Sequence, residues 1–276
     1  MGMIELHHVT AGYGDKPVLH DITADFQSGE LTVIIGPNGS GKSTLAALCM
    51  GLVRPMEGKV RWNGRDLQSI PVKERAVTAG LLSQEHPVPS LSVRRLVMHG
   101  RFSQVPWPRT YADDDKVLAD RALERAGIMD LADCSVAELS GGQRQKAYLA
   151  MLLNQDPEMM FFDEPSTFLD LPSQKHLEMT MRSLAREGHG VIAVVHDLNT
   201  ALKLADRILV MEKGQIRFDG TPEQLLASAI PQEVFGARIV PVIVEGSTEY
   251  IVKEASGHSG HSDRPQSGLS ETPDVL

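Results

Sequence analysis

A glycine-rich segment of eight residues, placed directly after an apolar run, most constrains how this chain can fold. The run is Leu31–Ile35, and the segment that follows reads Gly36-Pro37-Asn38-Gly39-Ser40-Gly41-Lys42-Ser43. The apolar run predicts a buried strand, and the periodicity from Lys42 to Val53 predicts a helix. Glycines between a strand and a helix let the backbone wrap around an anion with its N–H groups pointing inward. The spacing therefore predicts a phosphate-binding loop for ATP, in which Lys42 reaches the β and γ phosphates, Ser43 ligates Mg²⁺ and Thr44 reaches a neighbouring phosphate.

A second apolar run ends in two adjacent carboxylates. Met159–Phe162 predicts a buried strand, and Asp163 and Glu164 follow it directly, before Pro165. Beside a phosphate-binding loop, one such acid holds the Mg²⁺ shell and the other can polarise the attacking water as a general base. We assign the first role to Asp163 and the second to Glu164. A solvated pair of loop carboxylates is the alternative.

A third segment combines a hydroxyl with two glycines in front of a helix. It reads Leu139-Ser140-Gly141-Gly142-Gln143 and precedes a helical run from Arg144 to Leu153. Its small residues lie where the first N–H groups of a helix lack intrahelical partners. The pattern indicates a second anion-binding helix start, although Ser140 taken alone could be an ordinary N-cap.

The order of the expected elements predicts an α/β fold with a mostly parallel sheet and a strand-rich, antiparallel start over residues 3–35. Further expected elements are a strand and turn over 58–64, strands over 79–83 and 191–195, and helices over 174–186, 200–205 and 222–227. Residues 91–153 predict an inserted helical subdomain, in which Asp113-Asp114-Asp115 begins one helix and Gly127 ends it. We expect one domain over residues 1–253 and a disordered, polar tail over 254–276.

Composition excludes several classes of function. A net charge of −9 disfavours a nucleic-acid partner, because affinity for a phosphate backbone comes from clustered Lys and Arg. The two cysteines, Cys49 and Cys134, are too few for a disulfide framework and fit a reducing compartment. The chain has no apolar run of the roughly 18 residues needed to span a bilayer. We therefore expect any association with a membrane to depend on a protein partner.

Together, these segments resemble the ATP-binding cassette (ABC) ATPases, a class with a P-loop NTPase core, over about residues 3–240. The resemblance implies roles for four further residues, which chemistry alone leaves open. Tyr13 would stack on the adenine ring, Gln84 would touch Mg²⁺ or the lytic water, and His196 would contact the γ-phosphate. Asp170 would belong to the D-loop Ser166–Asp170, where Phe168 is bulkier and less polar than the family pattern. Without the resemblance, Tyr13 would be a packing residue and His196 a core or surface histidine.

The resemblance also implies how the site is completed. In this family the LSGGQ segment of one subunit closes over the nucleotide of another, so Ser140, Gly141, Gly142 and Gln143 would contact the ATP of a second copy. The active unit is then a head-to-tail homodimer. Its catalytic residues would be Lys42, Gln84, Glu164 and His196, and its Mg²⁺ ligands Ser43, Gln84 and Asp163.

A single cassette without a membrane span is similar to the detached ATPase subunit of a bacterial importer. Such a subunit works with transmembrane permease subunits at the cytoplasmic face of the plasma membrane, and indirectly with a substrate-binding protein. Three segments are similar to importers of iron–siderophore complexes, haem and cobalamin: Leu91–Arg101, His196–Asn199 and Glu233–Gly236. The alternatives are a zinc or manganese importer, a non-transport ABC ATPase of DNA repair, translation or iron–sulfur assembly, and a regulatory module without turnover.

Overall fold

The centre of the molecule is a six-stranded sheet in the order β10-β9-β3-β8-β7-β6. The computed structural model describes residues 2–105, 110–167 and 169–254. The strands of this sheet are β3 (Leu31–Ile35), β6 (Ala79–Leu82), β7 (Met159–Asp163), β8 (Gly190–Val194), β9 (Arg207–Glu212) and β10 (Gln215–Gly220). Five of them run parallel, and β10 pairs with β9 in the antiparallel sense. The expected mostly parallel sheet is thus confirmed.

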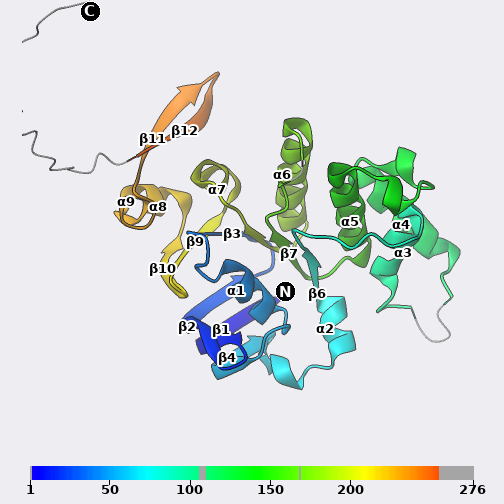
Figure 1. Cartoon of the computed structure of the whole chain (residues 1–276), viewed down its shortest axis with the longest axis horizontal. Coiled ribbons are helices and arrows are strands. Elements are labelled where there is room, and N and C mark those ends of the chain that lie inside the picture. The colour runs from blue at the N-terminus through cyan, green and yellow to red at the C-terminus, as the bar shows by residue number, and fades with distance from the viewer. Residues whose placement is uncertain (1, 106–109, 168, 255–276) are drawn as a thin grey trace, which may run out of the picture.

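The parallel strands are apolar because helices and a second sheet cover both faces. Every residue of β3 and β8 is buried, as are the first four residues of β7. Alternate side chains enter two separate hydrophobic clusters, with Phe161 in one and Phe162 in the other. The helices that pack on this sheet include α1 (Lys42–Cys49), α6 (Leu171–Arg186) and α7 (Leu198–Leu204) (Figure 1).

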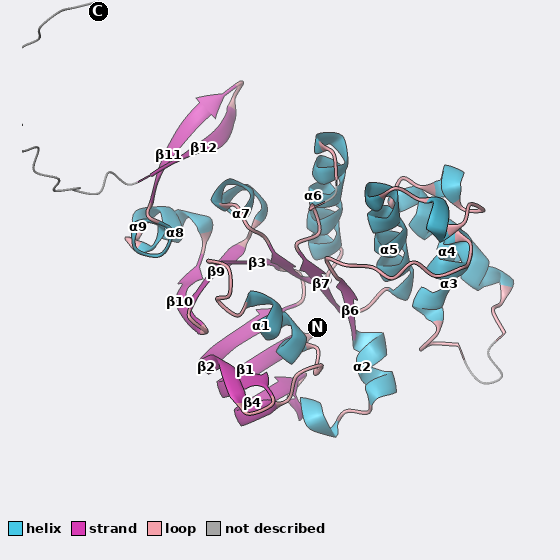
Figure 2. Ribbon diagram, viewed as in Figure 1, coloured by secondary structure: helices cyan, strands magenta, loops and turns pink. Residues whose placement is uncertain are grey.

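The strand-rich start forms a second, antiparallel sheet in the order β2-β1-β4-β5. Its strands are β1 (Met3–Tyr13), β2 (Lys16–Gln27), β4 (Pro55–Trp62) and β5 (Arg65–Asp66). Helix α1 lies between this sheet and the central one (Figure 2). The indole Nε1 of Trp62 donates to the carbonyl of Cys49 at 2.9 Å, so β4 is tied to the end of α1. That helix ends four residues before the expected Val53, because Gly51 takes the left-handed conformation at φ +71°.

A group of helices lies to one side of the central sheet, as expected. It consists of α3 (Val93–Met98), α4 (Asp113–Arg125) and α5 (Gly141–Gln155). The segments between these helices contain 3-10 turns over His99–Arg101, Met129–Leu131 and Val136–Glu138, and a further 3-10 turn over Leu67–Ser69 lies earlier in the chain. Helix α4 begins at Asp113 and Gly127 follows its end at φ +65°, both as expected. Helix α2 (Val72–Thr78) was not expected, and none of its seven residues is fully buried.

The chain continues through two short helices into a hairpin that projects from the body of the molecule (Figure 1). These elements are α8 (Pro222–Ala227), α9 (Ile230–Phe235), β11 (Ala237–Val244) and β12 (Ser247–Glu254). The helix over 222–227 is confirmed, with Thr221 as its N-cap. The tail expected from residue 254 lies outside the described residues beyond the last residue of β12.

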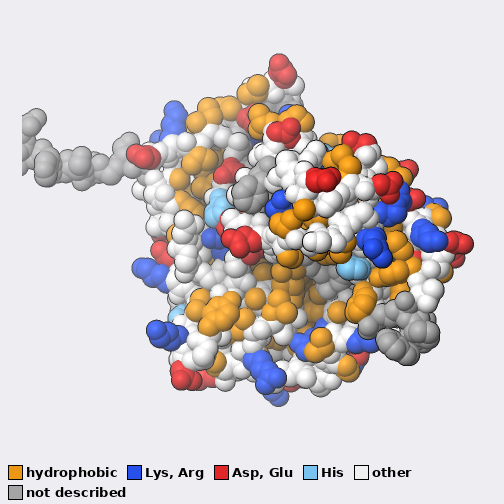
Figure 3. All heavy atoms as spheres, turned by 45° about the vertical axis from the view of Figure 1, so that its right-hand side comes forward, with side chains coloured by type: hydrophobic (Ala, Val, Ile, Leu, Met, Phe, Trp, Pro, Cys, Tyr) orange, Lys and Arg blue, Asp and Glu red, His pale blue; other side chains and the backbone are white. Residues whose placement is uncertain are grey.

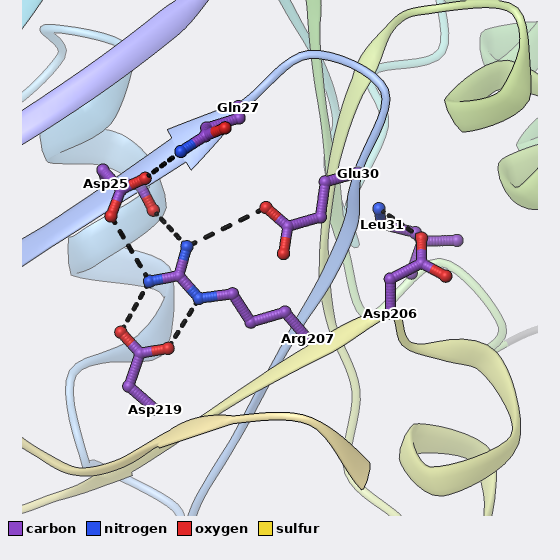
Figure 4. Close-up of polar contacts among 7 residues, drawn as sticks. All are labelled: Asp25, Gln27, Glu30, Leu31, Asp206, Arg207 and Asp219. Carbon is purple, nitrogen blue, oxygen red and sulfur yellow. Dashed lines mark hydrogen bonds and ion pairs between the residues drawn. The ribbon is translucent and has the colours of Figure 1, made fainter.

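One arginine joins three strands at the edge of the sheet where β3 and β9 begin (Figure 4). Arg207 donates from Nε and Nη2 to the two carboxylate oxygens of Asp219, at 2.6 Å each. Its Nη1 donates to the carbonyl of Asp25 at 3.0 Å and lies 3.8 Å from Oε2 of Glu30. Burial raises the pKa of Glu30, and the charge of Arg207 opposes that rise only in part. Beside this cluster, the Asp206 carboxylate accepts the backbone N–H of Leu31 at 2.9 Å.

The Arg207 cluster predicts opposite effects for two of its carboxylates. Because burial raises the pKa of Glu30, the folded state binds its proton more tightly than the unfolded chain, and ionised Glu30 costs stability at neutral pH. Glu30→Gln should therefore raise the free energy of unfolding at pH 7 by roughly 0.5 kcal/mol. The difference in unfolding free energy between Glu30→Gln and the wild type should vanish as the pH falls into the ordinary range of a glutamate pKa.

Asp219→Asn should instead lower the free energy of unfolding by about 2 kcal/mol, since it weakens both hydrogen bonds to the mostly buried guanidinium of Arg207. Urea unfolding at pH 7 and pH 4 checks both, and a destabilised Glu30→Gln at pH 7 would contradict the assignment.

Candidate functional site

The residues expected to carry chemistry follow the carboxyl ends of neighbouring parallel strands. Ile34 pairs with Val194, Ala193 with Phe162, and Phe162 with Leu82, so β3, β8, β7 and β6 end at the same edge. The glycine-rich loop follows β3, and His196 follows β8. Asp163 is the last residue of β7, Glu164 comes directly after it, and Gln84 follows β6. Four segments far apart in the sequence thus meet at one edge of the sheet.

The glycine-rich loop fits its place only with glycine at its first position. A Cβ on Gly36 would stand 2.1 Å from the carbonyl oxygen of Met211 on β9. Gly39 and Gly41 have φ values of +75° and +101°, which side-chain-bearing residues rarely adopt. These turns direct the loop back onto the start of α1, where the helix N–H groups and dipole favour an anion.

Two side chains in the loop are placed for a phosphate. The Lys42 ammonium donates to the carbonyls of Gly36 and Pro37 at 2.9 and 3.1 Å, inside the curve of the loop. Burial lowers the pKa of Lys42, while the carboxylates of Glu164 and Asp163 act in the opposite direction. The hydroxyl of Ser40 is buried and has no hydrogen-bond partner in the part of the chain that the structure describes. A buried, unsatisfied donor in such a loop fits a phosphate oxygen as its missing partner.

The expected Mg²⁺ ligands Ser43 and Asp163 are in contact. The Ser43 hydroxyl donates to Oδ1 of Asp163 at 3.2 Å. Burial raises the pKa of Asp163, the Ser43 hydrogen bond opposes this, and the neighbouring charge of Glu164 adds to it. Hydroxyl and carboxylate oxygens are the donors that Mg²⁺ prefers, and a dication would relieve the charge of the two adjacent acids. The donor set therefore fits this ion.

Glu164 and His196 form a close pair beside this contact. Oε1 of Glu164 lies 2.5 Å from Nε2 of His196, whose side chain is 50% exposed while that of Glu164 is 16% exposed. The backbone of Glu164 is in the left-handed region at φ +49°, and its N–H donates to the carbonyl of Val194 at 3.1 Å. A non-glycine residue in this conformation is held there by its surroundings. The turn after β7 thus aims Glu164 at His196.

Gln84 and Tyr13 lie at the rim of the site. Gln84 is exposed in the loop after β6, at the same edge as Asp163. Tyr13 ends β1 and is 59% exposed. Its hairpin approaches the loop, since the Leu19 side chain lies 2.8 Å from the place of a Cβ on Gly41.

The LSGGQ segment, residues 139–143, lies apart from the glycine-rich loop. The Ser140 hydroxyl accepts the N–H of Gln143 at 3.3 Å, and the Gln143 side chain accepts the N–H of Ser140 at 3.0 Å, a reciprocal cap at the start of α5. Ser140, Gly141, Gly142 and Gln143 line an open hollow of about 470 Å³ together with Lys146, Leu169, Asp170 and Ser173. The glycine-rich loop contributes no residue to this lining. Asp170 caps α6 by accepting the N–H of Ser173 at 3.1 Å, and Phe168 lies outside the described residues.

Three residues that the sequence analysis did not single out connect the loop after β6 to helix α5. Gln145 is buried, donates to the carbonyl of Pro165 and contacts His86, which in turn stacks on Tyr148. Burial lowers the pKa of His86, the Gln145 hydrogen bond opposes this, and the charge of Arg144 adds to it. The only signal in the sequence was spacing, because Gln145 falls on the same helical face as the apolar Leu149 and Leu152.

Comparison with known proteins identifies the family. A family model described as ABC transporter matches residues 19–167, more than half of the chain. The chain belongs to the ABC transporter family. It is 38% identical to the ferric enterobactin transport ATP-binding protein FepC of Escherichia coli (strain K12), over 83% of this chain and 86% of that protein. It is 36% identical to the hemin import ATP-binding protein HmuV of Rhodococcus jostii (strain RHA1), over 85% of this chain and 81% of that protein.

Solved structures of ABC proteins share the fold. The cbiO1 protein from Clostridium perfringens, part of the ABC transporter complex cbiONQ, superposes with a TM-score of 0.72 at 25% identity, over 82% of this chain and 90% of its own. A bacterial Atm1-family ABC exporter with ATP bound gives a TM-score of 0.72 at 26% identity, and the match spans 39% of that longer chain. Over residues 2–105, 110–167 and 169–254 of the ABC protein, no helix is both long and apolar enough to cross a membrane.

The close approach of Gly36 to the Met211 carbonyl gives a prediction about stability that can be tested without a ligand. Gly36→Ala must displace the Met211 carbonyl or the loop, and should lower the free energy of unfolding by more than about 2 kcal/mol. Gly39→Ala is the matched control, because its Cβ would meet open space and the cost is limited to the left-handed backbone, about 1 kcal/mol. Denaturant unfolding of both variants checks this, and equal losses would show that the Met211 contact does not matter.

Proposed function

We propose that this ABC protein is the ATP-hydrolysing subunit of a bacterial importer for iron–siderophore complexes, haem or cobalamin. The observation that carries the proposal is the meeting of Lys42, Ser43, Asp163, Glu164 and His196 at one edge of the sheet. Such a set can hold a nucleoside triphosphate and activate water beside it. The names of the relatives, which transport ferric enterobactin and hemin, support this class of cargo.

Binding of ATP begins at the glycine-rich loop. Gly36, Pro37, Asn38, Gly39, Ser40 and Gly41 surround the phosphates with backbone N–H groups, and the Ser40 hydroxyl gains the partner that it lacks. Lys42 exchanges its two carbonyl partners for the β and γ phosphates, while Thr44 reaches a neighbouring phosphate. The exposed ring of Tyr13 stacks on adenine. Mg²⁺, held by Ser43, Asp163 and Gln84, would offset phosphate charge when bound.

Hydrolysis depends on the pair of Glu164, after β7, and His196, after β8. Glu164 accepts the proton of the attacking water as general base, since its carboxylate lies beside the Mg²⁺ ligands in a turn that fixes its direction. His196 holds Glu164 in place at 2.5 Å and is exposed enough to reach the γ-phosphate. Lys42 and the opposing helix start offset the negative charge of the transferring phosphoryl group.

The second half of the site comes from a second copy of the chain. Ser140, Gly141, Gly142 and Gln143 present the positive end of α5, but they line a hollow of their own rather than the P-loop. A head-to-tail homodimer lets this hollow, with Asp170 at its side, cover the nucleotide of the partner. Each subunit of this dimer is a single cassette over residues 1–253.

An apolar groove supports docking on membrane subunits. Leu52 and Val72 are each 70% exposed, and with Ala76 and Leu81 they line a hollow of about 450 Å³ beside α2. Figure 3 shows orange side chains gathered along a hollow across the middle of this face. An apolar groove of this kind fits a short helix from a permease. Its wall includes β6, which leads into the loop of Gln84, so movement there reaches the site. The protein then lies at the cytoplasmic face of the membrane through its permease, which also meets a substrate-binding protein.

Removing the proposed base separates binding from turnover. Glu164→Gln keeps the size of the side chain and its contact with His196 but cannot accept a proton at neutral pH. We expect ATP affinity within about threefold of the wild type and kcat lower by at least about 100-fold. Size-exclusion chromatography with ATP and Mg²⁺ should show a trapped dimer.

Lys42→Ala provides the contrast for this experiment. It removes the ammonium from the loop, so the binding isotherm for ATP should weaken by at least about tenfold while the fold is kept. Wild-type turnover in Glu164→Gln would exclude Glu164 as the base. An unchanged isotherm in Lys42→Ala would exclude the loop as the phosphate site.

The importer proposal is checked by purification of the chain from its native membrane. We expect a permease of the iron-chelate class to accompany the wild type and to be largely lost from Leu52→Glu, which places a charge in the apolar groove. Met179→Glu is the control, since Met179 is 71% exposed on α6, away from the groove. Recovery with DNA or ribosomes and no membrane protein would overturn the transport proposal.

A further inference from the structure

The buried side-chain amide of Gln145, on α5, makes hydrogen bonds through both its nitrogen and its oxygen. It is 3% exposed, its Nε2 donates to the carbonyl of Pro165 at 3.0 Å, and its Oε1 lies 3.0 Å from Nε2 of His86. A carbonyl only accepts hydrogen bonds, so the nitrogen of Gln145 must face Pro165. The oxygen then accepts from His86, whose Nε2 carries the proton. The direction of both hydrogen bonds in the bridge His86–Gln145–Pro165 is therefore fixed.

Both ends of this bridge lie next to residues of the candidate site. Pro165 directly follows Glu164, in the turn that holds Glu164 at φ +49°. His86 stands two residues after Gln84, in the loop after β6. Gln145 is thus in direct contact with that loop at one end and with the carbonyl beside Glu164 at the other. By sequence, 59 residues separate His86 from Gln145 and 20 separate Gln145 from Pro165.

The loop end of the bridge is held firmly. The His86 ring stacks on Tyr148 with a centroid distance of 4.1 Å and an interplanar angle of 6°. The Tyr148 hydroxyl donates to the carbonyl of Pro87 at 2.8 Å. Since Tyr148 and Gln145 lie three residues apart on one face of α5, the loop is attached to this helix at two neighbouring points.

The geometry points to Gln145 as a positioning residue that connects the loop of Gln84 to the orientation of Glu164. This inference rests on the proposed function, because it concerns the same hydrolytic site. It adds that permease movement reaches the general base within one subunit, through the buried amide of α5. A simple core amide is the competing explanation, and α5 offers one for comparison. Asn154 is 4% exposed and donates to the carbonyl of Val97 at 2.8 Å, away from the site.

A double-mutant cycle on the full chain tests the bridge through steady-state ATPase kinetics. Gln145→Leu keeps the volume but removes both hydrogen bonds, and should lower kcat about tenfold with the KM for ATP within twofold of the wild type. His86→Phe keeps the stack on Tyr148 and removes the donor, and should lower kcat about threefold. The double variant should fall no further than Gln145→Leu alone, because the bridge is already broken. Asn154→Leu should lose a comparable amount of thermal stability with kcat unchanged.

Each outcome has a separate meaning. Equal kcat in Gln145→Leu and wild type, multiplied effects in the double variant, or a change confined to KM would overturn the inference. So would an equal loss of kcat in Asn154→Leu, which would show that any damage to α5 suffices. If Gln145→Leu does not fold, a wild-type kcat in His86→Phe overturns it instead. A wild type without ATPase activity would reject the proposed function itself and is thereby distinguishable.

Discussion

The burial of the parallel strands on both faces is the constraint on which the rest of the structure depends. A strand such as β3 or β8 has no exposed face on which to place a charged side chain. The charged groups of the site therefore lie beyond the ends of the strands or at their last residues. The parallel sense brings the ends of β3, β8, β7 and β6 to one edge, and the site is the direct result. Its residues come from four segments because each of these strands is followed by a separate loop at that edge.

The two edges of the sheet differ in how their charges are satisfied. At the edge where β3 and β9 begin, Arg207 pairs with Asp219 and Asp25, and Asp206 accepts a backbone N–H, so the groups satisfy one another within the chain. At the other edge Asp163 and Glu164 lie side by side, and the buried Ser40 hydroxyl has no partner among the described residues. The first arrangement stabilises the junction of the two sheets. Under the proposed function, the second would gain its missing partners from a bound phosphate and cation.

The sequence predicted what local pattern determines. The buried strands, the glycine-rich loop between β3 and α1, and the carboxylates at the end of β7 all depend on short runs of residues, and the structure has them in place. What it could not predict depends on contacts between distant segments. Arg207 joins strands through its hydrogen bond to Asp25, which lies 182 residues earlier in the sequence. Gln145 has the sequence pattern of an ordinary polar helix residue, and its role depends on contacts with the distant His86 and Pro165. The expected end of α1 at Val53 was wrong because the apolar pattern continues past Gly51, whereas the backbone does not.

Helix α5 has a place in both halves of the proposed dimeric site. In the proposed dimer, its first turn would present Ser140–Gln143 to the nucleotide of a second copy. Two residues later, Gln145 contacts the turn of Glu164 in its own subunit. A rigid helix of 15 residues cannot shift at one of these points and stay fixed at the other. Closure of the dimer would therefore alter the position of Pro165 through Gln145, and the loop of Gln84 would act on the same bridge through His86. Partner and permease would in this way act on one buried amide, which makes the timing of hydrolysis depend on both.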